Sequence, residues 1–184
     1  MKLIDLKEMF HGKYLHYYHL NYQNTSDQSK TYEIVSRNSI DTAGQLGQTP
    51  SGVSIIAFCD DRLLLLREFR MGVNRQIYNL CAGMLEQNES VEDCIRRELY
   101  EETGLSVHKI LEILPPSFAA VAISDVSTYF AFIEVSGTLS AMHSSANEEI
   151  TPAFFNATEL REMLKKEEFS SRAQLAAYYF CQMH

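Results

Sequence analysis

Three glutamates in one short stretch of sequence could hold a metal ion. Residues 90–103, SVEDCIRRELYEET, predict a helix that begins after a serine N-cap and ends at Gly104. Within it, Glu98 is followed after three and four residues by Glu101 and Glu102. Three like charges therefore share neighbouring surface, which destabilises the isolated helix. A cation held among them would remove that repulsion. Ligands that offer only oxygen suit Mg²⁺ or Mn²⁺ rather than zinc, so the spacing predicts a divalent-metal site.

The apolar side of the same helix supports this interpretation. Val91, Ile95 and Leu99 recur at helical spacing and define the face that packs on the core. Glu98 and Glu102 fall on that face, whereas the glutamates of a solvated helix face point away from the apolar residues. Burial raises the cost of their like charges. A metal site is therefore favoured over a solvated acidic face.

Further residues flank these glutamates at fixed intervals. Gly83 and Glu89 precede the helix, and Arg97 stands directly before Glu98. The whole run of residues 83–105, GMLEQNESVEDCIRRELYEETGL, matches the signature of the Nudix hydrolases at every fixed position, so the chain resembles that family. The resemblance implies an α/β/α sandwich built on a mixed sheet. It also implies hydrolysis of a nucleoside diphosphate linked to some other group.

The same resemblance implies roles for the matching residues. Divalent metal would be bound by four groups: the Ala82 carbonyl, Glu98, Glu101 and Glu102. Structural roles within the motif would fall to four others: Gly83, Glu89, Arg97 and Gly104. The metal would neutralise the pyrophosphate, polarise phosphorus and lower the pKa of a bound water. Water is then the nucleophile, and no covalent intermediate is required.

Outside the motif, the chain resembles the ADP-ribose and nucleotide-sugar pyrophosphatase branch of the family. Arg37 follows a small β unit similar to that branch's dimerisation domain, where the matching arginine tends to meet the substrate. Arg70 is a second candidate for substrate binding, because arginine binds phosphate bidentately. Glu148, or Glu149 beside it, lies where the branch has an acidic loop that can supply the general base, with Glu98 as the alternative. Surface arginines and solvated loop acids are the plainer interpretations.

Two departures from that branch bear on the substrate. Before the motif glycine, the branch usually has an acidic residue and a proline, whereas this chain has Asn79, Leu80, Cys81 and Ala82. An acidic partner on the metal side is thus missing from that position. Farther along, members of the ADP-ribose group often carry a proline where this chain has Ala120. The second departure weakens ADP-ribose as the specific substrate.

The remaining sequence predicts an α+β domain preceded by a small antiparallel β unit. Strand-like stretches at residues 14–22 and 31–36 flank a polar turn, which predicts a hairpin. Further strands are expected at residues 53–59, 62–69, 107–114 and 129–135, and helices at residues 158–166 and 171–183. Strands followed by helices favour a layered α+β fold.

A polar, glycine-bearing stretch without periodicity separates the hairpin from the later strands. We therefore expect an N-terminal β unit over residues 1–48 and a Nudix hydrolase domain over residues 49–184. A hairpin of this size is too small to be stable alone. It is expected to pair with a second subunit, which predicts a homodimer.

Composition excludes several classes of function. Of the 184 residues, 16 are Lys or Arg and 24 are Asp or Glu, and the net charge of −8 argues against binding of nucleic acid or an anionic membrane. No apolar run approaches the roughly 20 residues that span a bilayer, and the first residues do not resemble a signal peptide, so a cytoplasmic location is expected. The four cysteines form no CxxC pair and are expected to be reduced core residues.

The predicted activity is the hydrolysis of a nucleoside diphosphate sugar, ADP-ribose first, to a nucleoside monophosphate and a sugar phosphate. Mg²⁺ is the expected cofactor, with Mn²⁺ as the alternative. A nucleoside triphosphate, a dinucleotide or coenzyme A are alternative substrates within the same family. A nucleotide sensor without catalysis is the alternative from another class. Such sensors tend to lose motif glutamates, all of which this chain retains.

Overall fold

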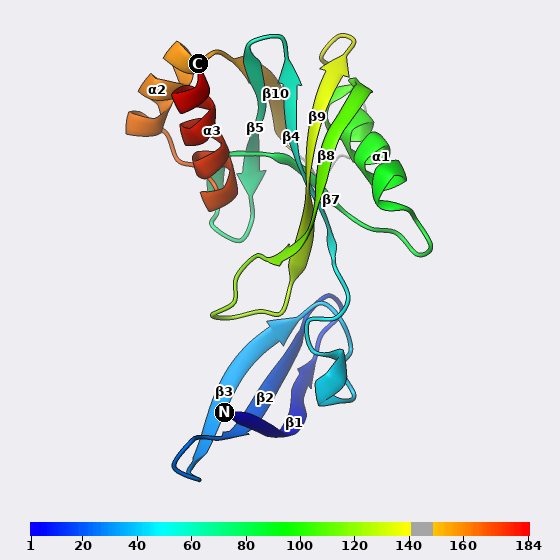
Figure 1. Ribbon diagram of the computed structural model, residues 1–184, viewed down its shortest axis with the longest axis vertical. Helices are drawn as coiled ribbons and strands as arrows, with labels where there is room; N and C mark the ends of the chain where they lie inside the picture. The colour runs from blue at the N-terminus through cyan, green and yellow to red at the C-terminus, as the bar shows by residue number, and fades with distance from the viewer. Residues whose placement is uncertain (141–148) are drawn as a thin grey trace. The chain divides into compact units, whose positions relative to one another are not determined.

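The computed structural model describes residues 1–140 and 149–184 (Figure 1). The strands are β1 Lys2–His11, β2 His16–Gln23, β3 Ser29–Ser36, β4 Gly52–Cys59, β5 Arg62–Arg70, β6 Arg75–Asn79, β7 Cys81–Met84, β8 Ser106–Phe118, β9 Ser127–Ser136 and β10 Ile150–Phe155. The helices are the 3₁₀ turn η1 Ala43–Gln45, α1 Val91–Thr103, α2 Ala157–Lys166 and α3 Ser171–Met183. Contacts divide the chain into two compact units, one of residues 1–51 and 116–129 and one of residues 52–115 and 130–184.

The first unit contains a three-stranded antiparallel sheet in the order β1, β2, β3. The turn between β2 and β3 is held by Asn24, whose Oδ1 accepts the backbone N–H groups of Ser26 and Gln28 at 2.9 Å each. A small core of Tyr18, Leu20, Ile34 and Ile40 lies beneath the sheet. The predicted antiparallel β unit is confirmed, and β1 adds a third strand that the sequence pattern did not indicate.

Residues 116–129 belong to the same unit as the N-terminal sheet. The Val35 backbone N–H donates to the carbonyl of Ile123 at 2.9 Å, and the Tyr32 hydroxyl donates to the carbonyl of Ala122 at 2.7 Å. The segment between β8 and β9 therefore packs on β3. A domain boundary between residues 48 and 49 stays a prediction.

The second unit is built on a sheet with the strand order β10, β5, β4, β9, β8, in which β6 also pairs with β5 and β7 with β4. The leucine run 63–66 of β5 is almost completely buried, as in a strand covered on both faces. Figure 1 shows α1 on one side of this sheet and α2 with α3 on the other. The predicted α+β class, with a mixed sheet between helical layers, is confirmed.

The start of α3 is tied to the short strand β6. The Tyr78 backbone N–H donates to the Glu168 carbonyl at 2.8 Å, and the Ser170 N–H donates to the Tyr78 carbonyl at 2.9 Å. Ser170 also caps α3, because its side chain accepts the N–H of Ala173. The first turn of α3 is thus held beside β6 and, through it, beside β5.

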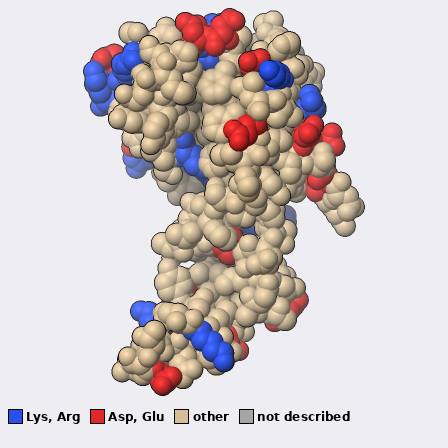
Figure 2. Space-filling view, viewed as in Figure 1, with Lys and Arg blue, Asp and Glu red and all other residues tan. Residues whose placement is uncertain are grey.

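The surface is mixed in charge. Figure 2 shows acidic and basic side chains interspersed over the face that it draws. In the part of the chain that the structure describes, no helix is long and apolar enough to cross a membrane.

Candidate active site

Helix α1 has the ends that its sequence predicts. The Ser90 side chain accepts the backbone N–H of Asp93 at 3.1 Å and caps the first turn. Gly104 ends the helix in the left-handed conformation at φ 71°, which glycine adopts without strain. Cys94, Ile95 and Leu99 are buried beneath the helix, so its orientation on the sheet is fixed. This orientation carries the glutamates toward β7.

Glu102 is a buried carboxylate beside the chain of β7. It is 8% exposed and accepts the backbone N–H of Ala82 at 3.2 Å. Burial raises the pKa of Glu102 to about 8, although the Ala82 N–H and the neighbouring Cys81 thiol both favour its ionised form. A bound cation would favour the ionised carboxylate here.

Glu98 lies against Gly83, where only a glycine leaves room. A Cβ atom at position 83 would stand 1.7 Å from the carboxylate carbon of Glu98, so any larger residue must displace that carboxylate. The Glu98 side chain is 14% exposed, and burial raises its pKa although Arg97 donates to it at 2.7 Å. The motif glycine therefore allows the Glu98 carboxylate to lie directly against the backbone of β7.

Arg97 braces the loop that leads into the helix. Its Nε and Nη2 donate to the two oxygens of Glu89 at 2.7 and 2.8 Å, and Nη2 also donates to the Met84 carbonyl at 2.9 Å. Glu89 in turn accepts the backbone N–H of Glu86 at 3.0 Å. The hydrogen bonds from Arg97 lower the pKa of Glu89 to about 2, so the pair is ionised at neutral pH. This network locks the loop between β7 and α1.

Glu101 completes the carboxylate cluster, by which we mean Glu98, Glu101 and Glu102. Its side chain is half exposed, and one oxygen accepts from Arg97 Nη1 at 3.3 Å. The same Nη1 also contacts Glu98, so the arginine bridges two members of the cluster. The donor set is carboxylate oxygen with a backbone carbonyl nearby, which fits Mg²⁺ or Mn²⁺. Arg97 Nη1 stands between Glu98 and Glu101, and the ligand oxygens of the three carboxylates do not all lie within 4.8 Å of one another.

A further acid, which the sequence analysis did not identify, lies near the carboxylate cluster. Glu68 on β5 is 5% exposed, and its charge contributes to the raised pKa of Glu102. Asn79 donates to Glu68 Oε1 at 2.6 Å, and the Ser170 hydroxyl donates to Asn79 Oδ1 at 2.6 Å. Asn79, in the stretch where the related branch usually has an acid, is thus an amide that binds a buried acid on the neighbouring strand β5. Arg70 Nε lies 3.4 Å from the same Glu68 oxygen.

Arg172, in the first turn of α3, was also missed. Its Nη1 donates to the hydroxyl of Ser54 at 2.8 Å, and Ser54 stands opposite Ala82 in the β4–β7 ladder. Burial, and then the nearby charge of Arg70, lowers the pKa of Arg172. A basic residue in a first turn opposes the helix dipole, and that was the one signal available in the sequence.

The other predicted residues lie in three different settings. Arg37 is exposed just after β3, in the unit of the N-terminal sheet. Glu148 lies outside the described residues. Glu149 is exposed, and its side chain accepts from the amide of Gln76 at 2.8 Å. Substrate binding by Arg37 and base catalysis by Glu148 stay predictions.

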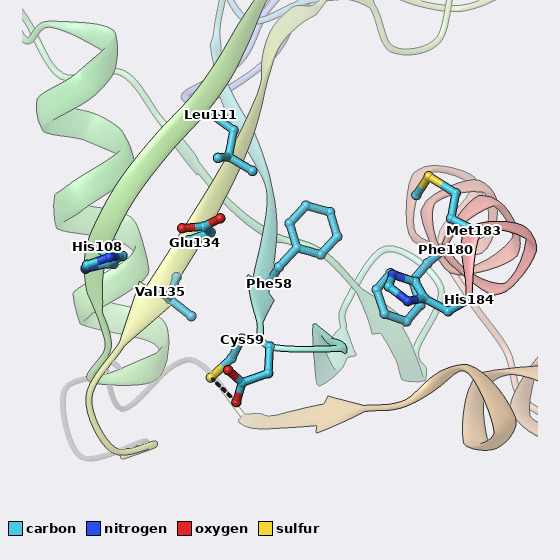
Figure 3. Close-up of a pocket in the computed structure, with 10 residues that line it drawn as sticks. Phe58, Cys59, His108, Leu111, Glu134, Val135, Phe180, Met183 and His184 are labelled. Atoms are coloured by element: carbon cyan, nitrogen blue, oxygen red, sulfur yellow. Dashed lines mark hydrogen bonds between the residues drawn. The ribbon is translucent and has the colours of Figure 1, made fainter.

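A separate hollow of about 550 Å³ lies elsewhere in the second unit (Figure 3). Phe58, Leu111 and Phe180 contribute apolar surface to it, and Glu134 and His108 contribute polar groups. None of its lining residues belongs to the carboxylate cluster or to the network around Arg97. The candidate active site is therefore the cluster rather than this hollow.

Comparison with known proteins identifies the family of the chain. A family model described as the NUDIX domain matches residues 48–178. A solved structure of an ADP compounds hydrolase superposes with a TM-score of 0.75 over 99% of this chain and 92% of that chain, at 15% sequence identity. At that identity the superposition shows the fold alone.

Curated relatives are similar over part of their length. The ADP-ribose pyrophosphatase of Bacillus subtilis (strain 168) is 28% identical over 113 residues, which cover 61% of this chain and 55% of the relative. The GDP-mannose pyrophosphatase of Yersinia enterocolitica is 26% identical over 111 residues, which cover 55% of this chain and 58% of the relative. The ADP-ribose pyrophosphatase of Escherichia coli (strain K12) is 26% identical over 131 residues, which cover 67% and 63%. The matches thus span between half and two thirds of the length of these relatives.

Proposed function

This chain belongs to the Nudix family, and from that premise we propose that it hydrolyses the pyrophosphate bond of a nucleoside diphosphate sugar. ADP-ribose is the first substrate to consider, and the products are a nucleoside monophosphate and a sugar phosphate. The proposal rests on buried Glu102 and largely buried Glu98, which lie beside Ala82 and Gly83 next to a motif loop held by the Arg97–Glu89 ion pair. Relatives named ADP-ribose and GDP-mannose pyrophosphatase support this choice of substrate class.

Divalent metal is the cofactor that this site fits, with Mg²⁺ first and Mn²⁺ as the alternative. The groups that would hold it are the Ala82 carbonyl, Glu98, Glu101 and Glu102. When bound, the metal supplies charge neutralisation at the pyrophosphate and lowers the pKa of a coordinated water. Burial raises the pKa values of Glu98 and Glu102, and a cation bound at the cluster would stabilise their ionised forms and lower those pKa values.

The residues of the chain would share the remaining tasks. Glu98 or Glu148 would accept the proton of the attacking water. Arg70 and Arg172 would bind the phosphates or the ribose, since each lies within the network that adjoins the cluster. Arg37 is a further candidate for substrate binding.

The first unit supports a proposed homodimer. β1 is an edge strand, and Ile4, Met9 and Phe10 on it are exposed. An exposed apolar edge is a favourable surface for pairing with a second copy. For the same protein we propose a small-molecule partner only, without nucleic acid or membrane, and a cytoplasmic location.

A substrate panel tests the proposed class. Equal concentrations of ADP-ribose, GDP-mannose, ATP, a diadenosine polyphosphate and coenzyme A should be incubated with the protein and Mg²⁺, and kcat/KM compared. We expect the two nucleotide sugars to be cleaved at least about tenfold more efficiently than the rest, a difference of about 1.4 kcal/mol in transition-state stabilisation. Preference for the triphosphate, dinucleotide or coenzyme would move the assignment within the family. Binding without cleavage of every compound would favour a sensor.

A further inference from the structure

The end of the β1–β2 hairpin gathers three groups that can ligate a metal, all within the first unit. His11 ends β1 and His16 begins β2, and the two stand opposite each other in the antiparallel register. Glu8 lies three residues before His11 on β1, next to a β-bulge between Glu8 and Phe10. The nearest nitrogen or oxygen atoms of the three side chains all lie within 4.8 Å of one another. Among the described residues, this is the one set of three histidine, cysteine or acidic groups that meets this condition.

The distances are close to those of a metal-bound set. Glu8 Oε1 lies 2.7 Å from His16 Nδ1 and 3.1 Å from His11 Nδ1. Ligands bonded to a tetrahedral zinc at about 2.0–2.1 Å stand roughly 3.3 Å apart. Opening the present hydrogen bonds by a few tenths of an ångström would therefore admit a cation between the three groups.

The three side chains differ in how firmly they are held, so the exposed ones can adjust to a bound ion while the buried one stays in place. His16 is 8% exposed and stacks on the buried Tyr18 with ring centroids 6.3 Å apart, so its position is fixed. The His11 side chain is 67% exposed and packs edge-on against His16. It can turn to adjust its bond length without disturbing the core.

We propose that Glu8, His11 and His16 form a second metal site, for a zinc-type divalent cation, distinct in chemistry from the carboxylate cluster. Two imidazoles and one carboxylate suit Zn²⁺ and neighbouring first-row transition metals, whereas Mg²⁺ prefers oxygen ligands alone. The two sites therefore select different ions from the same solution. The ion would link β1 to β2 at the closed end of the hairpin and stabilise the first unit.

Cobalt absorption tests the site directly. Tetrahedral Co²⁺ has strong visible absorption bands, whereas Co²⁺ in an octahedral site of oxygen ligands has only weak ones. The metal-free full chain should be titrated with Co²⁺ in excess Mg²⁺, which occupies the carboxylate cluster, and the bound Co²⁺ then displaced with Zn²⁺. We expect one equivalent of Co²⁺ to give these bands and one equivalent of Zn²⁺ to remove them. His11→Asn, at an exposed position, should weaken Zn²⁺ binding by at least about tenfold.

His19→Asn is the matched control, because His19 also lies on β2 but outside the cluster. Glu8→Gln provides a second variant at an exposed position. Loss of the bands in His11→Asn and Glu8→Gln, but not in His19→Asn, supports the site. Binding that is equal in all four proteins, or no tetrahedral bands in the wild type, would overturn it. Hydrolysis of ADP-ribose is not the readout, so either result leaves the proposed function to its own test.

Discussion

At the scale of single residues, Glu102 is the carboxylate on which the proposed metal site depends most. Glu102→Gln keeps the size and the hydrogen bond to the Ala82 amide but removes the charge that a metal needs. Turnover should fall by at least about a hundredfold, since the loss of a metal ligand exceeds the usual cost of losing a supporting contact. Circular dichroism and thermal unfolding should show an intact fold. Glu92→Gln, an exposed acid in the first turn of the same helix, is the control and should keep full turnover. Unchanged turnover in Glu102→Gln would remove the residue from the metal site.

The pH dependence of stability should report the same carboxylate. In the metal-free protein the pKa of Glu102 is raised from 4.5 to about 8, so the folded state binds its proton more tightly than the unfolded state. The stabilisation of the folded state by this proton is fully present below about pH 4.5 and is lost as the pH rises through about 8. We expect urea unfolding in EDTA to show that the free energy of unfolding of Glu102→Gln rises relative to that of the wild type between pH 5 and pH 9. The rise should be on the order of a few kcal/mol. Parallel pH profiles would contradict the buried state of Glu102.

Gly83 offers a steric test of the cluster. Gly83→Ala places a methyl group where the Glu98 carboxylate lies, so Glu98 must move away from β7. The Mg²⁺ concentration that gives half-maximal turnover should rise by at least about tenfold. Gly72→Ala is the control, because a Cβ there meets no atom within 4 Å. Equal Mg²⁺ dependence in the two variants would show that Glu98 does not bind the metal.

At the scale of elements, helix α1 was predictable and its surroundings were less so. Its cap, its apolar face and its terminal glycine are all local signals, and the structure has them where the sequence placed them. The pairing of Asn79 with Glu68 depends on the β5–β6 register, in which Asn79 stands opposite Leu66. Such a register arises from tertiary packing, and a strand as short as β6 carries too few residues to reveal it.

Strand β1 shows the same limit in another way. Its pairing with β2 shifts between Leu3 and Asp5 and again between Glu8 and Phe10. Each shift breaks the alternation of apolar and polar residues by which a strand is recognised. Most of the strand is also exposed, so no buried face imposes a pattern on it.

Arg172, in the first turn of α3, is expected to take part in substrate binding. Arg172→Gln removes a cation that lies beside Ser54 and in the neighbourhood of Arg70, where the phosphates would bind. The KM for ADP-ribose should rise by about tenfold with a smaller change in kcat, as expected for lost ground-state binding. Arg96→Gln, an exposed residue of α1, is the control. An unaltered KM in Arg172→Gln would show that this arginine does not bind the substrate.

At the scale of the whole molecule, the N-terminal sheet should govern assembly. Phe10→Lys places a charge on an edge strand where Phe10 is now 66% exposed. Light scattering after size exclusion should show a dimer for the wild type and a shift toward monomer for the variant. Leu175→Lys, at an exposed apolar position on α3, should leave the dimer intact. A wild-type monomer at micromolar concentration would contradict the proposed pairing.

The overall composition and the motif predicted the class of molecule, but not how the chain is divided. The charge balance and the helix signals needed only local sequence. The membership of residues 116–129 in the unit of the N-terminal sheet rests on long-range bonds such as Val35 to Ile123. These bonds join residues about 90 positions apart in the chain, so no local sequence pattern in either segment reveals the partnership.

Hydrolysis at the carboxylate cluster can be measured by incubating the purified chain with ADP-ribose and Mg²⁺ and separating the products by chromatography. We predict AMP and ribose 5-phosphate in equal amounts, formed by the wild type with Mg²⁺, absent with EDTA and lost in Glu102→Gln. AMP formation that persists in EDTA or in Glu102→Gln would contradict a reaction at the carboxylate cluster. ADP-ribose that stays intact with the wild type and Mg²⁺ would contradict the proposed substrate.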